Sequence, residues 1–148
     1  MIVQEAMTKD VVTINSTASI SGTATLMGEK RIGGVVVVED GKPVGILTER
    51  DILTKVVGVA KDAAKMQVKD VMSFPLKTID PKERLERATQ AMTDAKIRRL
   101  AVIEDQRLVG IVTAADIVRV YLDADRVIWD LAMKNLVEVK SRMPRKLV

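Results

Sequence analysis

The sequence contains no cysteine and no histidine among its 148 residues. Without cysteine there is no disulfide, no thiol nucleophile and no cysteine-ligated zinc site. Without histidine the commonest general acid–base group is missing as well. The remaining residues form no recognisable nucleophile–base or metal constellation, so we expect a protein that is not an enzyme and holds no catalytic metal.

Aromatic residues are also scarce, at one Trp, one Tyr and one Phe, although 47% of the residues are hydrophobic. The core must therefore be aliphatic, and nucleic-acid bases would find few side chains to stack on. No run approaches the roughly 18–20 apolar residues that span a bilayer. The first residues lack the layout of a secretory signal. We therefore expect a cytoplasmic protein with no membrane partner.

The net charge of +4 belongs to the end of the chain rather than to its body. The last nine residues hold four basic side chains and no acidic one, namely Lys140, Arg142, Arg145 and Lys146. Without these four, 20 basic residues face 20 acidic ones. Binding of nucleic acid through this tail is an alternative that the neutral body does not favour.

What the sequence does contain is an internal repeat. Residues 45–51 read GILTERD and residues 110–116 read GIVTAAD, a difference of 65 in numbering. The similarity continues without a gap from about residue 7 to residue 52 in the first copy, and from 72 to 117 in the second. Matches spread over a whole unit at one fixed offset indicate a duplicated fold.

Each copy predicts the order β-α-β-β-α. Short amphipathic turns are expected at 3–7 and 68–72, first strands at 11–14 and 76–79, buried β-branched strands at 35–38 and 100–103, and returning strands that start at 44 and 109. Asp40-Gly41 is a strong signal for a hairpin turn, and Asp105-Gln106 is its less ideal counterpart.

Helical periodicity fills the remaining segments. In the second copy Asp80, Pro81 and Glu83 predict a helix start with a capping box. The apolar stripes of the first helices are Leu85, Ala88, Met92 and Ala95, and more faintly Ile20, Ala24 and Met27. The second helices are expected to bury Ile52, Leu53 and Val56 in the first copy, with Gly58 as the stop, and Ile117, Val118 and Tyr121 in the second.

One unit of about 50 residues is too small for a generous core. We therefore expect an α/β (α+β) protein in which two units pack sheet to sheet as a pseudo-twofold pair, share one core and leave a cleft between them. The expected boundaries are 1–57 for unit 1, 58–67 for a linker, 68–122 for unit 2, 123–138 for a C-terminal helix with Trp129 in packing, and 139–148 for a basic tail.

The Thr48-x-x-Asp51 frame has two interpretations. Such a pair before an apolar run is a helix cap. However, the same frame recurs at Thr113 and Asp116, and the glycine before each frame would let a ligand approach the backbone closely. A helix start attracts phosphate, and a carboxylate there can accept the two hydroxyls of a ribose. The two interpretations are compatible.

The paired Gly-x-x-Thr-x-x-Asp frames, the apolar strand before Glu-Asp and the gapless duplication resemble a cystathionine-β-synthase (CBS) domain pair, or Bateman module. The resemblance covers residues 1 to about 122. It implies a stand-alone, prokaryotic regulatory module that binds AMP, ADP, ATP or S-adenosylmethionine in its cleft and signals to an unnamed effector protein. It also implies a homodimer. The alternative is a structural or protein-interaction module with a vestigial cleft.

The resemblance also implies roles for individual residues. Asp51 and Asp116 would hold ribose hydroxyls, with Thr48 and Thr113 near the ribose or phosphate. The Asp51 site would include Phe74, Pro75 and Ile97, and the Asp116 site Lys9, Asp10 and Ile32. Arg98 and Arg99 stand where the family often has a basic residue and would face phosphates, or form an ordinary exposed pair. Unit 1 has Gly33 and Gly34 there, so we expect two unequal sites.

Overall fold

The computed structural model describes residues 1–124, 133 and 134. Its helices are α1 (Val3–Ala6), α2 (Ile20–Lys30), α3 (Glu49–Ile52), α4 (Leu85–Ala95) and α5 (Ala114–Ala124), with short helical turns η1 (Leu53–Val57) and η2 (Val68–Asp70). Its strands are β1 (Thr13–Asn15), β2 (Gly34–Glu39), β3 (Lys42–Thr48), β4 (Thr78–Ile79), β5 (Arg99–Glu104) and β6 (Arg107–Thr113). No helix in the described part of the chain is both long and apolar enough to cross a membrane.

Two predicted segments lie almost wholly outside the described residues. The C-terminal helix was expected over 123–138, and of this range only 123, 124, 133 and 134 are described. Residues 123 and 124 form the end of α5. Trp129 and the basic tail at 139–148 lie outside the described residues.

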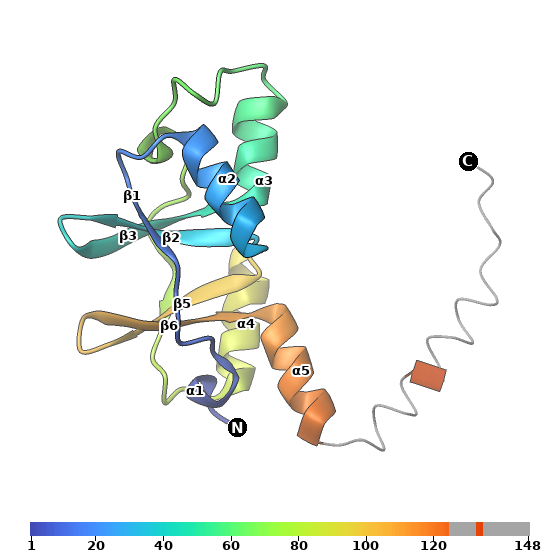
Figure 1. Ribbon diagram of the computed structural model, residues 1–148. Coiled ribbons are helices and arrows are strands. Elements are labelled where there is room, and N and C mark those ends of the chain that lie inside the picture. Colours follow the sequence, from blue (N-terminus) through green and yellow to red (C-terminus); the bar gives the residue numbers. More distant parts are fainter. Residues whose placement is uncertain (125–132, 135–148) are drawn as a thin grey trace.

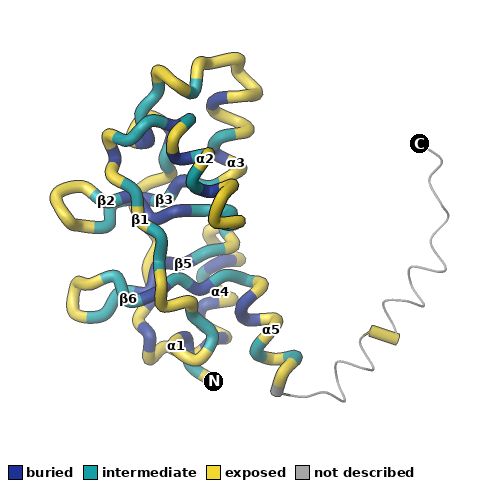
Figure 2. The backbone as a smooth tube through the Cα atoms, viewed as in Figure 1, coloured by how far each residue is buried: buried dark blue, intermediate teal, exposed yellow. Residues whose placement is uncertain are grey.

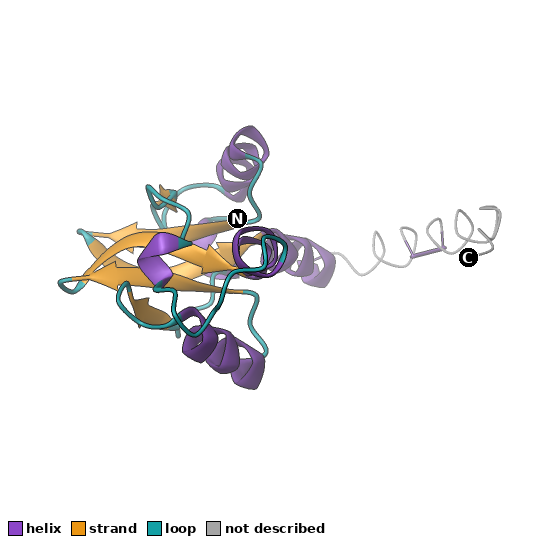
Figure 3. Ribbon diagram, turned by 90° about the horizontal axis from the view of Figure 1, so that it is seen from above, coloured by secondary structure: helices purple, strands orange, loops and turns teal. Residues whose placement is uncertain are grey.

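The two three-stranded sheets confirm the predicted duplication. In each, the first strand runs parallel to the second and the second antiparallel to the third, in the orders β1-β2-β3 and β4-β5-β6. The registers also correspond, because Val37 faces Gly45 in one sheet and Val102 faces Gly110 in the other. The strands form the middle of the molecule and the helices lie around them (Figures 1 and 3).

Both hairpin turns are confirmed. Asp40 and Gly41 have φ angles of 49° and 76°, and Asp105 and Gln106 have 49° and 65°. Two successive positive φ angles are the signature of a type I′ turn, whose twist matches that of the flanking strands. Gln106 adopts the conformation that a glycine favours, which is why its sequence signal was weaker.

The predicted start of α4 was wrong by four residues. The helix begins at Leu85 with Arg84 as its N-cap, the counterpart of Ser19 before α2. Residues 80–83 form a turn instead, closed by a hydrogen bond of 3.1 Å from the Glu83 amide to the Asp80 carbonyl. The carbonyls of Pro81 and Glu83 accept hydrogen bonds from the N-terminal segment, so tertiary pairing outweighs the local capping signal.

The second helices bury fewer residues than predicted. Val56 and Ile117 are buried, at 1% and 6% exposed, as expected. Three other residues expected in the core are exposed, namely Leu53 at 61%, Val118 at 55% and Tyr121 at 41%. Only one side of each helix contacts its own sheet, and these side chains lie on the other side. The helix in unit 1 ends before Gly58 as predicted. Gly58 itself has a φ of −65° and does not adopt the left-handed conformation that is common at helix ends.

The expected single core was also wrong, because each unit has its own. One cluster is built on Leu85, Leu100 and Val112, and the other on Ile20, Val35 and Leu47. Figure 2 shows buried backbone along the central strands and exposed backbone at the ends of the hairpins. Between the sheets, Val36 and Ala101 are fully buried and belong to neither cluster. They alternate with core residues along β2 and β5, so they face the other sheet.

Each core is completed by the segment that leads the other unit. Val3, near the N-terminus, is fully buried in the unit 2 core, and Val68 and Val71 are buried in the unit 1 core. The backbone bonds correspond under the 65-residue offset: the Val3 amide donates to the Glu83 carbonyl and the Val68 amide to the Ala18 carbonyl, both at 2.8 Å. The two units are therefore interleaved.

Candidate functional site

Both Thr-x-x-Asp frames are helix caps. The Asp51 amide donates to Thr48 Oγ1 at 3.3 Å, and the Thr48 amide donates to Asp51 Oδ2 at 3.0 Å. In unit 2 the corresponding distances for Thr113 and Asp116 are 3.1 and 2.9 Å. The aspartates are only 6% and 8% exposed. A buried carboxylate needs further partners, and here the two units differ.

Asp51 is surrounded by donors. Its Oδ1 accepts from Ser73 Oγ at 2.9 Å and pairs with Lys55 Nζ at 3.0 Å. Its Oδ2 accepts from the Thr48 hydroxyl at 3.1 Å as well as from the Thr48 amide. Lys55 Nζ also donates to the Val71 carbonyl at 3.0 Å. The carboxylate therefore joins the start of the unit 1 helix to the segment that leads unit 2.

Asp116 has fewer partners. Besides the Thr113 amide, the only partner of its carboxylate within the described residues is Arg119, whose Nη1 lies 3.3 Å from Oδ1. The Arg119 side chain is 67% exposed. At the offset of 65, Lys55 corresponds to Val120 and Ser73 to Thr8. Within residues 1–124 no side-chain hydrogen bond joins Thr8 to Asp116.

The glycines before the frames are needed for chain packing. A side chain at Gly45 would meet the Ser73 carbonyl oxygen at 2.8 Å, and one at Gly110 would meet the Thr8 carbonyl oxygen at 3.0 Å. Next to them, Ser73 pairs with Ile46 and Thr8 with Ile111 through two backbone hydrogen bonds each. The close approach that we expected of a ligand is therefore made by the protein itself.

Arg99 lies across the two units. Its Cδ and Nε come within 3.3 Å of the place that a Cβ at Gly34 would occupy, and its guanidinium reaches the corresponding place at Gly33, as does Glu49 Oε1 at 2.9 Å. Residues 34 and 99 correspond under the offset and contact each other, so they lie close to the pseudo-twofold axis. Only one large side chain fits there, which explains why glycines face the arginine.

The other predicted residues fall into two groups. Phe74, Pro75, Lys9 and Asp10 follow Ser73 or Thr8 directly and are exposed, Phe74 at 71%. Arg98 is exposed and its carbonyl accepts from the Ala114 amide at 2.9 Å. Two isoleucines are partly buried instead: Ile32 packs against the unit 1 core and Ile97 against the unit 2 core.

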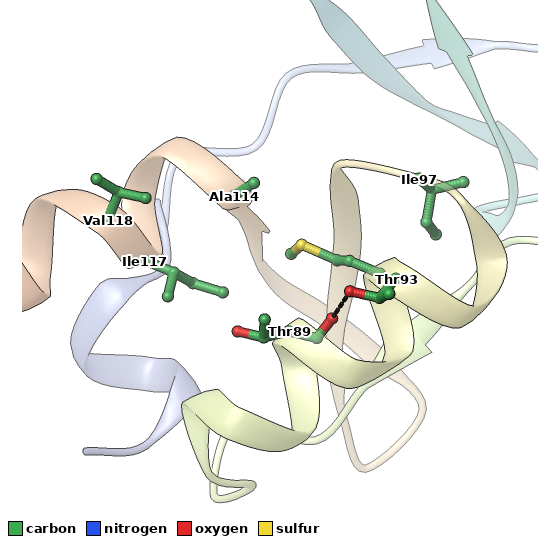
Figure 4. Close-up of a pocket in the computed structure, with 7 residues that line it drawn as sticks. Thr89, Thr93, Ile97, Ala114, Ile117 and Val118 are labelled. Atoms are coloured by element: carbon green, nitrogen blue, oxygen red, sulfur yellow. Dashed lines mark hydrogen bonds between the residues drawn. The ribbon is translucent and has the colours of Figure 1, made fainter. Parts of the chain in front are cut away.

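A hollow of about 240 Å³ lies between α4 and α5 (Figure 4). Mostly apolar side chains line it: Thr89, Met92, Thr93, Ile97, Ala114, Ile117 and Val118. No residue of either Thr-x-x-Asp frame apart from the intervening Ala114 is among them. Ligand pockets usually measure about 300–1,000 Å³, so the hollow is small for a whole nucleotide.

Two ionisable side chains near α4 and α5 have shifted pKa values. The pKa of Glu86 is lowered, first by a hydrogen bond from its own backbone amide, against a smaller opposing effect of desolvation, and then by Arg84 and Tyr121. The pKa of Tyr121 is raised, first by desolvation and then by the charge of Glu86. The Tyr121 hydroxyl donates to Glu86 Oε1 at 3.3 Å.

Three residues at the frames were missed by the sequence analysis: Lys55, Ser73 and Arg119. Helical spacing was an available signal, because Lys55 follows Asp51 by four residues and Arg119 follows Asp116 by three. The repeat was a signal for Ser73, since its counterpart Thr8 also carries a hydroxyl.

Comparison with known proteins agrees with this duplicated architecture. A model of the CBS domain matches residues 3–58 and 68–123. The chain belongs to the CBS domain family. The CBS domain-containing protein YhcV of Bacillus subtilis is 36% identical over 115 residues, which cover 78% of this chain and 81% of that protein. A Methanopyrus kandleri protein named as uncharacterized is 39% identical over 120 residues, and the match covers 80% of this chain but 61% of that longer relative.

Solved structures of CBS proteins share the fold. The CBS-domain containing protein ATU1752 from Agrobacterium tumefaciens matches with a TM-score of 0.76 and 29% identity, covering 82% of this chain and 99% of that one. A hexameric CBS-CP12 protein from bloom-forming cyanobacteria matches with a TM-score of 0.75 and 34% identity, covering 80% and 66%. The named relatives are CBS domain or uncharacterized proteins, and none carries the name of an enzyme.

Proposed function

We propose that this CBS domain protein is a non-catalytic regulatory module that binds an adenosine-containing ligand, such as AMP, ADP, ATP or S-adenosylmethionine, and reports its level to an effector protein. The observation that carries the proposal is the pair of buried carboxylates at matched helix starts. A carboxylate held in place by backbone amides is suited to accept hydrogen bonds from the two hydroxyls of a ribose.

Residues around the frames support this proposal. Phe74 and Pro75, on the Asp51 side, and Lys9 and Asp10, on the Asp116 side, are exposed next to the strands that bridge the units. We propose that these residues border the ligand. Arg98, Arg99 and Arg119 are the cations that we propose for the phosphates, because charge-assisted bonds to phosphate are strong.

A ligand screen tests the proposal. AMP, ADP, ATP, S-adenosylmethionine and NAD at millimolar concentration are compared by thermal shift and calorimetry. A ligand at 100 times its dissociation constant stabilises the folded state by about 2.7 kcal/mol, so at least one should raise the melting temperature clearly. If none of the five shifts the melting temperature or releases heat, the sensor function is refuted.

The frames themselves are tested by Asp116→Asn. Asparagine keeps the cap but lacks the second carboxylate oxygen, so affinity for every ribose ligand should fall while the melting temperature changes little. Unchanged nucleotide affinity in a folded Asp116→Asn protein would show that this aspartate is only a cap.

A structural module with a vestigial cleft is the second candidate. The observation in its favour is Asp51, whose oxygens are already occupied by protein donors. The two candidates differ in the screen, because a structural module binds none of the five ligands.

We also propose that the protein forms a homodimer through an outer helix face, defined here as Leu53, Val57, Val118 and Tyr121. These side chains are 61%, 64%, 55% and 41% exposed. They lie on α5 and on the corresponding turn η1, and the hollow beside Val118 adds to the apolar surface. Large exposed apolar side chains at matched places on two helices commonly mark an interaction surface.

A further inference from the structure

We infer that Lys55 and Ser73 convert Asp51 into a latch between the two units, so that Asp116 is the carboxylate that takes the ribose and one chain binds one nucleotide. This inference rests on the proposed function and adds to it the occupancy of the two sites and the residue that decides it.

The first step concerns the acceptor capacity of a carboxylate. Its two oxygens offer about four acceptor positions. In Asp51 four donors fill them: the Ser73 hydroxyl, the Lys55 ammonium, and the hydroxyl and amide of Thr48. A ribose diol reaching Asp51 would have to displace two of these donors.

The second step concerns what displacement would disrupt. Ser73 lies in the segment that leads unit 2, and its backbone pairs with Ile46 of β3. Lys55 holds the same segment a second time through the Val71 carbonyl at 3.0 Å. Releasing Asp51 would therefore also loosen the joint between the units, which raises the free-energy cost of binding there.

The third step is the comparison with Asp116. Within the described residues its carboxylate has two partners, the Thr113 amide and Arg119, which leave about two acceptor positions for a diol. Val120 corresponds to Lys55 in the repeat, and its side chain carries no charge that could pair with Asp116. Arg119 is 67% exposed, so it can leave the carboxylate at little cost and turn toward a phosphate.

The test compares the unaltered chain with an opened variant that combines Lys55→Met and Ser73→Ala. Methionine keeps the length of the lysine stem without its charge. Titration calorimetry with AMP should give one equivalent per unaltered chain and two per opened variant. Lys42→Met, at the exposed first residue of β3, is the matched control and should stay at one. Asp116→Asn in the unaltered background should give none.

Hydrogen exchange supplies a readout that needs no ligand. In the opened variant the amides of Val71, Met72 and Ser73 should exchange about tenfold faster, because charged hydrogen bonds that hold the segment are gone. The amides of Thr8 and Ile111, at the corresponding bridge on the other side, should be unchanged and serve as an internal control.

The outcomes separate this inference from the proposed function. Two equivalents of AMP on the unaltered chain would overturn the latch and leave the function intact. The latch would also be overturned if the opened variant bound only one equivalent of AMP, or if the opened variant bound AMP and the unaltered chain did not. If neither protein takes AMP or any of the other four ligands of the screen, both the inference and the adenosine site are refuted. Unchanged exchange at residues 71–73 would overturn the latch whatever the nucleotide does.

Discussion

At the scale of single residues, the glycines before the two Thr-x-x-Asp frames were expected to make room for a ligand, and in the structure they make room for another segment of the chain. Gly45 and Gly110 lie where the segment that leads the other unit crosses the sheet. At Gly45 the Ser73 carbonyl occupies the space of a side chain, and at Gly110 the Met7 side chain and the Thr8 carbonyl do so. A backbone that is itself hydrogen-bonded to the strand cannot easily move away.

Gly45→Ala should therefore lower the free energy of unfolding by about 1–3 kcal/mol, as overpacking does. The new Cβ would meet the Ser73 carbonyl at 2.8 Å. Urea denaturation measures the change. The matched control is Gly28→Ala, in the exposed part of α2, where an added Cβ meets nothing within 4 Å.

The control variant should have a higher free energy of unfolding, not a lower one. Alanine in a helix is favoured over glycine by roughly 0.5–1 kcal/mol, so Gly28→Ala should stabilise the protein. Equal stabilities for the two alanine variants would contradict the assignment of Gly45 to chain packing.

The Thr-x-x-Asp caps were predictable because they are local: a hydroxyl and a carboxylate three residues apart meet at any helix start. The identity of the other partners of Asp51 was not. Ser73 lies 22 residues away, and no local rule brings it to Asp51. Arg99 illustrates the same limit, because its contact with Gly33 and Gly34 depends on where the axis between the units falls.

At the scale of elements, strands and turns were predicted better than helix starts. Alternation, β-branched residues and the Asp-Gly turn are decided within a hairpin. The start of α4 depends on residues 3 and 4, whose amides bond the carbonyls of residues 83 and 81. Residues 80–83 carry the sequence of a cap, and only the distant segment shows that they form a turn.

The leading segment α1 should stabilise unit 2 and not unit 1. Val3 is fully buried in the unit 2 core, so Val3→Ala should cost about 1–3 kcal/mol. Hydrogen exchange should rise in β5 and β6 first. Val59→Ala, at a residue 53% exposed, should change stability by less than about 0.5 kcal/mol. Faster exchange confined to residues 13–48 would contradict the interleaved packing.

The contact between α4 and α5 makes a prediction about pH. The pKa of Glu86 is lowered, most by its backbone hydrogen bond and further by Arg84 and Tyr121. Because the folded pKa is depressed, the stabilisation is present above the pKa of an unfolded glutamate and is lost as pH falls through the folded value. NMR titration should show Glu86 ionising below its ordinary range, and Tyr121→Phe should move its pKa upward. A pKa unaffected by Tyr121→Phe would mean that the two side chains do not interact in solution.

At the scale of the whole molecule, the pairing of two units was predictable and their interleaving was not. The 65-residue repeat and the small size of one unit required a pair. The same burial pattern would arise if each leading segment packed on its own unit, since Val3 and Val68 are equivalent in sequence. The expectation of one shared core was wrong because each sheet is buried on both faces. One face packs against the helices of its own unit and forms a separate core, and the other face packs against the other sheet.

The outer helix face makes a prediction about assembly. Replacing Leu53 and Val118 by glutamate should leave the fold intact, since they are 61% and 55% exposed, and should abolish the proposed homodimer because charge on an apolar contact is costly to bury. Light scattering checks this against the 16.3 kDa of one chain. Lys42→Glu, at the exposed first residue of β3, is the control. An unaltered protein that already scatters as a monomer at micromolar concentration would refute the dimer.

The bridge between Thr8 and Ile111 has a consequence for how the chain is made. These residues are 103 positions apart (111 − 8). A ribosome delivers Thr8 first, and at about 5–20 residues per second it needs roughly 5–20 seconds to supply the strand to which Thr8 binds. Unit 1, in contrast, can be completed as soon as Ser73 has emerged. Synthesis therefore supplies the first half with its N-terminal segment still unpaired, and that segment waits until the second half arrives to receive it.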